Sequence, residues 1–171
     1  MKRLSFTLLI YLSLLPVAMA QSSLHISKQD FRGQFLNAIN AKRAKGCNCG
    51  NIYMKPAQPL TWNDKLALAA KEHAEDMYAQ NYFSHDSKDG RKMENRMLDV
   101  GYTYKGFRKY AIGENIAFNQ RSIDEVLTGW FKSNAHCKNL MNPDFTEIGI
   151  AEYKYYWVQD FGGRVSFAFR K

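Results

Sequence analysis

The chain lacks several features that would assign it to other protein classes. After its first 20 residues, no apolar run is long enough to span a bilayer. It has no internal repeats and no low-complexity tracts. It also carries no nucleic-acid-binding motif, so nucleic acid is not an expected partner. The helix-borne His-Glu-x-x-His pattern of many metalloproteases is missing as well.

The first 20 residues have the organisation of a targeting segment. Lys2 and Arg3 precede a mostly apolar stretch over 4–17, and residues 18–20 read Ala-Met-Ala, a small-x-small cleavage site. We predict a signal peptide over 1–20 rather than a membrane anchor, because the apolar stretch is short for a spanning helix. No cysteine follows the cleavage site, so a lipoprotein is not indicated. The expected location is secreted or periplasmic, with no transmembrane segment after cleavage.

Cleavage would leave a chain of single-domain size. Of 171 residues, 151 remain, enough to bury a real core. We predict a short leader over 21–29 and one domain over 30–171, which we expect to be a monomer. The formal charge falls from +8 to +6 because Lys2 and Arg3 are removed. The basic residues are scattered, which favours a solvated surface over a specific polyanion site, although loose attraction to anionic lipid or cell-wall polymers stays open.

Apolar periodicity and capping residues predict helices before residue 142, over about 28–45, 63–80, 92–100, 123–132 and 135–141. Residues 47–59 and 81–91 are predicted loops, and 102–110 is predicted to be extended. Strands are predicted over 147–153, 155–161 and 164–169, with a turn at Gly162-Gly163. Helices followed by strands indicate the α+β class.

Three separated stretches carry the candidate chemistry. They are Phe83-Ser84-His85, residues 113–117 (Gly-Glu-Asn-Ile-Ala), and His136-Cys137. Each is predicted to lie in a loop-like setting. Two imidazoles and a carboxylate brought together would form a polar cleft that can hold a divalent metal or transfer a proton.

These stretches, in this order, resemble the CAP superfamily, also called the SCP domain, which includes cysteine-rich secretory proteins, antigen-five allergens and pathogenesis-related proteins. The resemblance is to its secreted bacterial branch and covers about 30–162. It implies an α-β-α sandwich with a central antiparallel sheet. Further matching segments are Leu60-Thr61-Trp62-Asn63 with Leu66-Ala67, Trp130, Phe145-Thr146-Glu147-Ile148-Gly149 and Tyr156-Trp157-Val158-Gln159.

The resemblance also implies site residues. His85 and His136 match the two site histidines of the family, and Glu114 matches the carboxylate. These three are the candidate ligands of a divalent metal such as Zn²⁺. The second Glu of the eukaryotic pattern is absent, because Ser133 stands three residues after Trp130.

Further residues are assigned to the surroundings of the cleft. Ser84 and Asn115 are predicted to orient the imidazoles. Glu147 is predicted to point toward the cleft or to cap a strand end. His73 is interpreted as a packed helix residue. Asn95-Arg96 is interpreted as a fold-holding pair or a solvated face.

The three cysteines are expected to meet an oxidising compartment. The resemblance implies a Cys49–Cys137 disulfide, which would stabilise the fold by about 3–5 kcal/mol. Cys47 is left as a free thiol, an intermolecular partner or a competitor for Cys137. A Cys137 nucleophile with His136 as its base is a sharper alternative.

Three functions are compatible with these residues. The first is an exported binding or interaction module whose His/Glu cleft holds a metal or a small ligand, with a lipid, a sterol-like molecule or a cell-envelope component as partner. The second is a metal-dependent hydrolase acting on a peptide, lipid or cell-wall substrate. The third is a structural envelope protein in which the histidines brace loops.

Overall fold

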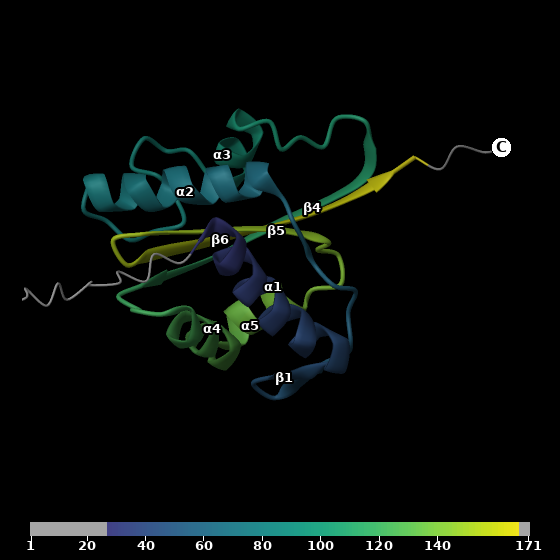
Figure 1. Ribbon diagram of the computed structural model, residues 1–171. Helices are drawn as coiled ribbons and strands as arrows, with labels where there is room; N and C mark the ends of the chain where they lie inside the picture. Colours follow the sequence, from purple (N-terminus) through teal and green to yellow (C-terminus); the bar gives the residue numbers. More distant parts are fainter. Residues whose placement is uncertain (1–26, 168–171) are drawn as a thin grey trace, which may run out of the picture.

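A computed structural model describes residues 27–167, apart from the side chains of Lys28 and Gln29. The predicted signal peptide and residues 21–26 of the predicted leader lie outside this range. The domain is a three-layer α-β-α sandwich (Figure 1). One helical layer contains α2 and α3, and the other contains α1, α4 and α5. The predicted fold class is confirmed.

Eleven elements make up the described part of the chain. The helices are α1 (Lys28–Lys45), α2 (Asp64–Ala79), α3 (Met93–Asp99), α4 (Ile123–Lys132) and α5 (Asn134–Met141). The strands are β1 (Cys47–Cys49), β2 (Ile52–Met54), β3 (Thr61–Trp62), β4 (Phe107–Phe118), β5 (Glu147–Tyr153) and β6 (Tyr156–Ser166).

The central sheet has the strand order β3-β5-β6-β4. Strands β5, β6 and β4 are antiparallel, as predicted for the sheet, whereas the two-residue β3 pairs with β5 in parallel. Strand β4 therefore forms one edge of the sheet. On the other edge, β3 covers only the first residues of β5.

The predicted turn at Gly162-Gly163 is wrong, because both glycines lie inside the continuous strand β6. A Cβ on Gly162 would lie 1.9 Å from the hydroxyl of Tyr102, and one on Gly163 would lie 1.8 Å from the carbonyl oxygen of Asp144. The glycines therefore permit close packing against the strand and do not form a turn. Of the predicted last strand, residues 168 and 169 lie outside the described range.

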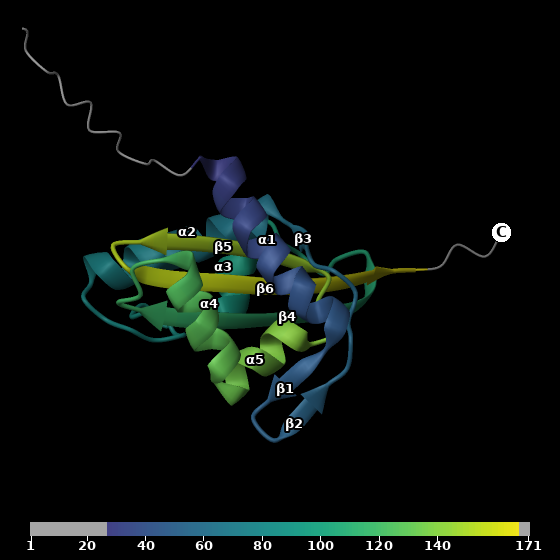
Figure 2. The same cartoon turned by 60° about the horizontal axis from the view of Figure 1, so that its bottom comes forward.

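The structure also corrects two predicted loops. Residues 113–117 lie within β4, which pairs with β6 along almost its whole length, so Glu114 and Asn115 are strand residues. Their polarity hid the strand signal, because neither residue is typical of strands. The predicted loop over 47–59 contains the β1–β2 hairpin, which lies beside α5 (Figure 2).

The predicted helix ends are confirmed where capping residues identified them. Ser27 accepts a hydrogen bond from the amide of Asp30 at the start of α1. Asn63 and Ser122 cap α2 and α4 in the same way. Gly46 ends α1 with a φ of 74°, a conformation that favours glycine.

The largest apolar cluster lies between the sheet and the layer of α1, α4 and α5. Phe35 from α1, Trp130 from α4 and Phe161 from β6 are almost completely buried there. Burying a large apolar side chain contributes about 1.5–3 kcal/mol. This face of the sheet is therefore the main source of stability.

A buried arginine ties α1 to the segment between α5 and β5. The guanidinium of Arg43 donates to the carbonyl oxygens of Gln58 at 2.7 Å, Leu140 at 2.7 Å, Asn142 at 3.1 Å and Phe145 at 3.0 Å. Burial lowers the pKa of Arg43 to about 10, so it stays charged at neutral pH. The carbonyl groups replace the water that it loses on folding.

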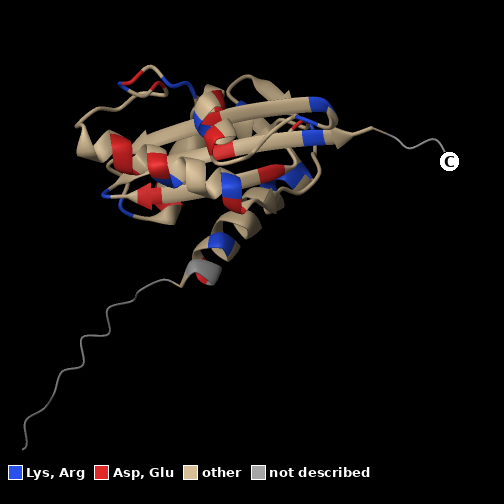
Figure 3. Cartoon of the chain, turned by 90° about the horizontal axis from the view of Figure 1, so that it is seen from above, with Lys and Arg blue, Asp and Glu red and all other residues tan. Residues whose placement is uncertain are grey.

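Charged residues of both signs are interspersed over the domain in the view of Figure 3, in keeping with the predicted solvated surface. Among the helices of residues 27–167, none is long and apolar enough to cross a bilayer.

Candidate functional site at the β4 edge

The candidate site is built around Glu114 in the edge strand β4. Its carboxylate is almost completely buried on the face of the sheet that α2 and α3 cover. Oε1 lies 2.7 Å from Nδ1 of His85, and Oε2 accepts a hydrogen bond of 2.7 Å from Arg96. The carboxylate therefore joins the loop before α3 to α3 itself.

Arg96 is a site residue that the sequence interpretation underestimated. Only 2% of it is exposed, and it also donates to the hydroxyl of Ser87 and to the carbonyl of Arg91. The available signal was Glu114 itself, since a carboxylate flanked by apolar residues requires a buried partner. The structure provides two partners, the imidazole of His85 and the guanidinium of Arg96.

The ion pairs set the protonation of this cluster. Burial alone would raise the pKa of Glu114, but the hydrogen bond with His85 and the charge of Arg96 outweigh burial and lower the pKa below its ordinary value. The same hydrogen bond raises the pKa of His85, although partial burial opposes it. Glu114 is therefore ionised at neutral pH and favours a protonated His85.

His85 is the point at which this buried cluster reaches solvent. Its side chain is 55% exposed, whereas that of Glu114 is 2% exposed. A cavity of about 420 Å³ opens beside them. Its lining residues are His85, Asp86, Lys92, Met93, Glu94, Ile112 and Glu114. With Nδ1 engaged by Glu114, Nε2 is the ring nitrogen left for a ligand.

His136 reaches the same region from the opposite helical layer. It lies in α5, directly before the disulfide-bonded Cys137, and is half-buried. Burial lowers its pKa, and a nearby positive charge on His85 lowers it further. His136 is therefore neutral at pH 7, which is the form that binds metals.

The predicted metal ligands are not gathered at ligating distance. Within residues 27–167, one group of three or more candidate ligand atoms lies within 4.8 Å of one another, and it comprises Cys47, Cys49 and Cys137. The donor atoms of His85, Glu114 and His136 do not form such a group. Both Glu114 oxygens already have partners, so Glu114 orients His85 in this structure.

Ser84 shapes the loop that carries His85. Its hydroxyl accepts a hydrogen bond of 3.1 Å from the amide of Asp86, and its carbonyl accepts one of 2.9 Å from Nε2 of His73. His73 is fully buried in α2, as predicted. Burial lowers the pKa of His73, so the neutral ring donates to Ser84.

Asn115 faces the opposite side of the sheet from Glu114, because successive strand residues alternate. Its amide nitrogen donates to Oε1 of Gln159 at 2.9 Å and to the carbonyl oxygen of His136 at 3.3 Å. Asn139 donates to its amide oxygen at 2.9 Å and to the carbonyl of Glu114 at 3.1 Å. Asn115 thus positions the backbone of His136. The sequence did not point to Asn139.

Glu147 belongs to a separate network at the start of β5. It accepts hydrogen bonds from Arg164 at 2.9 and 3.0 Å, from Tyr102 at 2.7 Å and from Asn63 at 2.6 Å. Burial would raise its pKa, but these donors, Arg164 first, lower it overall. Glu147 does not line the cavity beside His85. Glu147 was predicted to point toward the cleft or to cap a strand end, and the structure places it at the strand end.

The order and spacing of these residues agree with a known family. The profile of the CAP family, described as the Cysteine-rich secretory protein family, matches residues 36–161. The chain belongs to this family. The predicted membership is confirmed, and most of the described CAP domain lies within the matched region.

Two curated relatives are bacterial. YkwD of Bacillus subtilis (strain 168), described as uncharacterised, is 36% identical over 109 residues, which cover 63% of this chain and 40% of YkwD. YlbC, described as an uncharacterised membrane protein of the same strain, is 37% identical over 102 residues, covering 60% of this chain and 28% of YlbC. This CAP chain thus matches less than half the length of either relative.

Solved structures share the CAP fold. An extracellular Bacillus anthracis protein containing an SCP domain superposes with a TM-score of 0.64 at 31% identity, over 76% of this chain and 39% of that one. An outer surface protein of Borrelia burgdorferi superposes with a TM-score of 0.63 at 22% identity, over 80% and 94% of the two chains. The second likeness shows the fold alone.

A buried carboxyl group that the sequence did not suggest lies directly across from Glu114 in the CAP sheet. Asp160 of β6 pairs with Glu114 and is 1% exposed. Burial raises its pKa well above the ordinary value, and the Glu114 carboxylate raises it further. Asp160 is therefore neutral beside an ionised Glu114. If both carboxylates were ionised, their negative charges would repel each other in a region with little water.

The cysteines of this CAP domain pair as predicted. Cys49 and Cys137 form the disulfide, with a Cα–Cα distance of 5.4 Å. Because Cys137 is oxidised, a Cys137 nucleophile paired with His136 is ruled out in this state. Cys47 is free, and its sulfur lies 3.9 Å from that of Cys137.

Proposed function

We propose that this chain is an exported CAP binding module whose cleft holds a divalent metal such as Zn²⁺ between His85 and His136. The observation that carries the proposal is the 2.7 Å hydrogen bond between Nδ1 of His85 and the buried carboxylate of Glu114. A metal-binding histidine typically uses one ring nitrogen for the metal while the other donates to a carboxylate. His85 has the carboxylate partner on Nδ1, and a metal would bind at Nε2 with release of the proton that this nitrogen carries in the protonated ring.

Two features of these residues favour such an ion. His136 is neutral, and Glu114 fixes the ring of His85 in place. Because both Glu114 oxygens already have partners, we assign Glu114 as the orienting carboxylate and not as a ligand. Two imidazoles leave positions for water or for an anionic group of a ligand. A lipid headgroup, a sterol-like molecule or a cell-envelope component would supply such a group or fill the neighbouring cavity.

Export is supported by three independent features. They are the predicted signal peptide, the Cys49–Cys137 disulfide, which is typical of oxidising compartments, and the similarity to an extracellular and an outer surface protein. We propose an extracytoplasmic location on these grounds. We expect the module to be a monomer.

The test is a calorimetric Zn²⁺ titration of the chain without its signal peptide. The titration is made in a Cys47→Ser background, so that the free thiol cannot contribute ligands. We expect one saturable site, loss of binding in the His85→Ala/His136→Ala double variant, and at least tenfold weaker binding in Glu114→Gln. Equal binding by the parent and the double variant would refute the metal site.

A second candidate is the predicted hydrolase. It is favoured by the same dyad, because a half-exposed imidazole oriented by a buried carboxylate also has the arrangement of a general base. Within residues 27–167, no hydrogen bond joins the Ser84 hydroxyl to His85, so Ser84 is not activated as a nucleophile by this imidazole. Hydrolysis would therefore use water. Turnover of peptide, ester or cell-wall substrates that disappears in His85→Ala would support this function, and its absence across such a panel would exclude it.

A further inference from the structure

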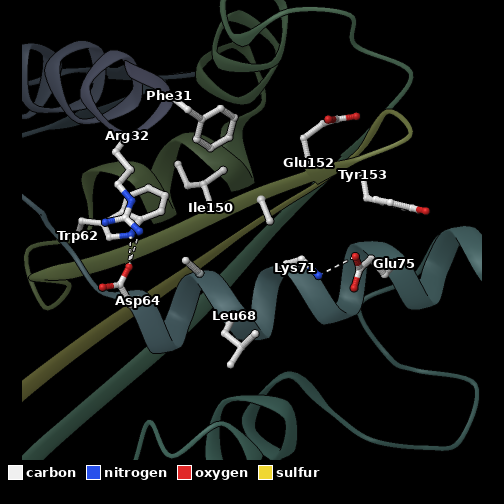
Figure 4. Close-up of a pocket in the computed structure, with 12 residues that line it drawn as sticks. Phe31, Arg32, Trp62, Asp64, Leu68, Lys71, Glu75, Ile150, Glu152 and Tyr153 are labelled. Atoms are coloured by element: carbon white, nitrogen blue, oxygen red, sulfur yellow. Dashed lines mark hydrogen bonds and ion pairs between the residues drawn. The ribbon is translucent and has the colours of Figure 1, made fainter. Parts of the chain in front are cut away.

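A second groove lies at the opposite edge of the sheet from Glu114. It has a volume of about 430 Å³ and runs along the outer side of β5, between the first turns of α1 and the length of α2 (Figure 4). Phe31 and Arg32 of α1, Trp62 of β3 and Leu68 of α2 line it together with residues 150–153 of β5. No residue of the His85 cavity contributes to it.

The backbone of β5 is open along this groove. Strand β3 pairs only with Glu147 and Ile148, and its last contact is the hydrogen bond from the amide of Asn63 to the carbonyl of Ile148, at 2.8 Å. The chain then turns into α2. Within residues 27–167, no strand pairs with the outer side of β5 over 149–153.

The β5–β6 turn identifies the groups that face the groove. Lys154 and Tyr155 have φ values of 49° and 67°, so they form a two-residue turn between the paired residues Tyr153 and Tyr156. In such a hairpin, the residues that flank the turn point their amide and carbonyl groups at each other. Backbone direction alternates along a strand, so the amide and carbonyl groups of Ile150 and Glu152 point away from β6. Ile150 is only 2% exposed, whereas Glu152 is exposed, so the amide and carbonyl of Glu152 are the groups open to the groove.

The side chains around this open edge are mainly apolar. Leu68 is 44% exposed and Tyr153 is 36% exposed, although both are large. The charged residues largely pair with one another, Arg32 with Asp64 at 2.5 Å and Lys71 with Glu75 at 2.7 Å. The groove therefore offers apolar contacts and unpaired backbone groups, but little net charge.

We infer that this groove binds an extended, largely uncharged peptide segment of another protein, which adds a strand to β5. The unpaired run over 149–153 corresponds to about 16 Å of strand, and its accessible part is residues 151–153. Peptides bind to free sheet edges through main-chain hydrogen bonds, with alternate side chains entering pockets. The flanking helices α1 and α2 recess the edge, so a single extended chain fits better than the sheet edge of a second folded copy.

The backbone groups also distinguish a peptide from an acyl chain. A fatty acyl chain in the groove would cover the amide and carbonyl of Glu152 without pairing them. Burying a polar group without a hydrogen-bond partner is unfavourable. A peptide satisfies these groups and makes the same apolar contacts with Leu68 and Tyr153.

The test uses a displayed library of random nine-residue peptides, selected on the chain without its signal peptide. The best peptide is synthesised, and its affinity is measured by fluorescence polarisation. Glu152→Pro removes one groove-facing amide but keeps the ladder with β6, because proline is tolerated where its nitrogen faces away from the partner strand. Glu152→Ala is the matched control, since it removes the same side chain and keeps the amide.

We expect selected peptides with alternating β-branched or aromatic residues. Glu152→Pro and Leu68→Glu should each weaken binding at least tenfold, and Glu152→Ala less than twofold. If Glu152→Pro does not fold, as judged by circular dichroism, N-methylation of single peptide residues replaces it. The expected loss of binding then occurs at every second position.

Three outcomes would overturn the inference. They are no enrichment of peptides, equal affinity of the best peptide for Glu152→Pro and Glu152→Ala, and loss of affinity at every N-methylated position or at none. Oleate binding that depends on Leu68 but not on the amide of Glu152, without peptide enrichment, would assign the groove to an acyl chain. Zn²⁺ binding at the β4 edge is measured separately, so the two proposals fail independently.

Discussion

The two faces of the central sheet are built from alternate residues of the same strands, yet they differ in chemistry. On the side of α1, α4 and α5, one large cluster of buried aromatic and aliphatic side chains fills the interface. On the side of α2 and α3, two smaller apolar clusters lie around a buried polar group formed by Glu114, Arg96, His73 and Asp160, in which Glu114 and Arg96 form an ion pair. The first face stabilises the fold, and the second holds the candidate site.

The neighbouring residues Glu114 and Asn115 show the difference most directly. Glu114 lies in the buried polar group and orients His85, whereas Asn115 faces the other layer and holds α5. A one-residue change of register would exchange these roles. Each face of β4 thus positions one of the two candidate histidines. Glu114 orients the ring of His85, and Asn115 holds the backbone of His136.

The largest effect is expected from removing the Glu114 carboxylate on the face that α2 and α3 cover. Glu114→Ala leaves Arg96 as a buried unpaired charge, which costs about 3–5 kcal/mol of unfolding free energy. The pKa of His85 should fall toward its ordinary value, because its hydrogen bond raised it. Denaturant unfolding and an NMR titration of His85 measure the two effects.

The matched control is Glu75→Ala on the surface of α2. Glu75 forms an exposed ion pair with Lys71, so its removal should change the unfolding free energy by no more than about 0.5 kcal/mol. If the two variants were equally stable, the buried Arg96 would not need Glu114 as its ion-pair partner.

A smaller effect on stability is expected from removing the side chain of Asn115, which faces the other helical layer. Asn115→Ala removes the donor to Oε1 of Gln159 and one of the two acceptors of the Asn139 amide nitrogen, and it should cost about 1–3 kcal/mol. Because Asn115 faces away from His85, the His85 pKa should stay unchanged. A shift of that pKa as large as in Glu114→Ala would show that the two faces are not separate.

The buried Asp160, on the same face as Glu114, should make the stability of the protein depend on pH. The folded pKa of Asp160 is raised, so its contribution is fully present below the unfolded value of about 3.9 and is lost as pH rises through the folded pKa. Asp160→Asn cannot ionise. Relative to the parent, it should therefore become more stable between pH 3 and pH 7. Denaturant unfolding at several pH values measures this, and a pH-independent difference would contradict a neutral Asp160.

The smallest effect concerns the covalent tie between β1 and α5. In Cys49→Ser, we expect Cys47 to pair with Cys137, because their sulfurs are already 3.9 Å apart. The two possible loops differ by two residues, so unfolding free energy should change by less than about 1 kcal/mol, against about 3–5 kcal/mol for Cys137→Ser. Non-reduced peptide mapping identifies the bond. Free thiols at both Cys47 and Cys137 after oxidation would contradict the expected pairing.

Local signals predicted much of the fold. Ser27, Asn63 and Ser122 identified helix starts because a capping side chain acts on amides two or three residues away. The errors arose where a residue's role depends on distant packing. Gly162 and Gly163 suggested a turn, but they are glycines because Tyr102 and Asp144 pack against them. Glu114 and Asn115 did not indicate a strand, because polar residues of these types are uncommon in strands. They are tolerated here because Arg96 and Gln159, which are distant in the sequence, form hydrogen bonds with them.

The sequence by itself determined the family, the positions of most helices, the disulfide pairing implied by the family and the identity of His85, Glu114 and His136 as candidates. Tertiary structure alone decided which partners they have. It placed Arg96 and Asp160 against Glu114, turned Asn115 away from the cleft and left the outer side of β5 unpaired. These features depend on contacts between residues far apart in the chain, and sequence spacing does not encode such contacts.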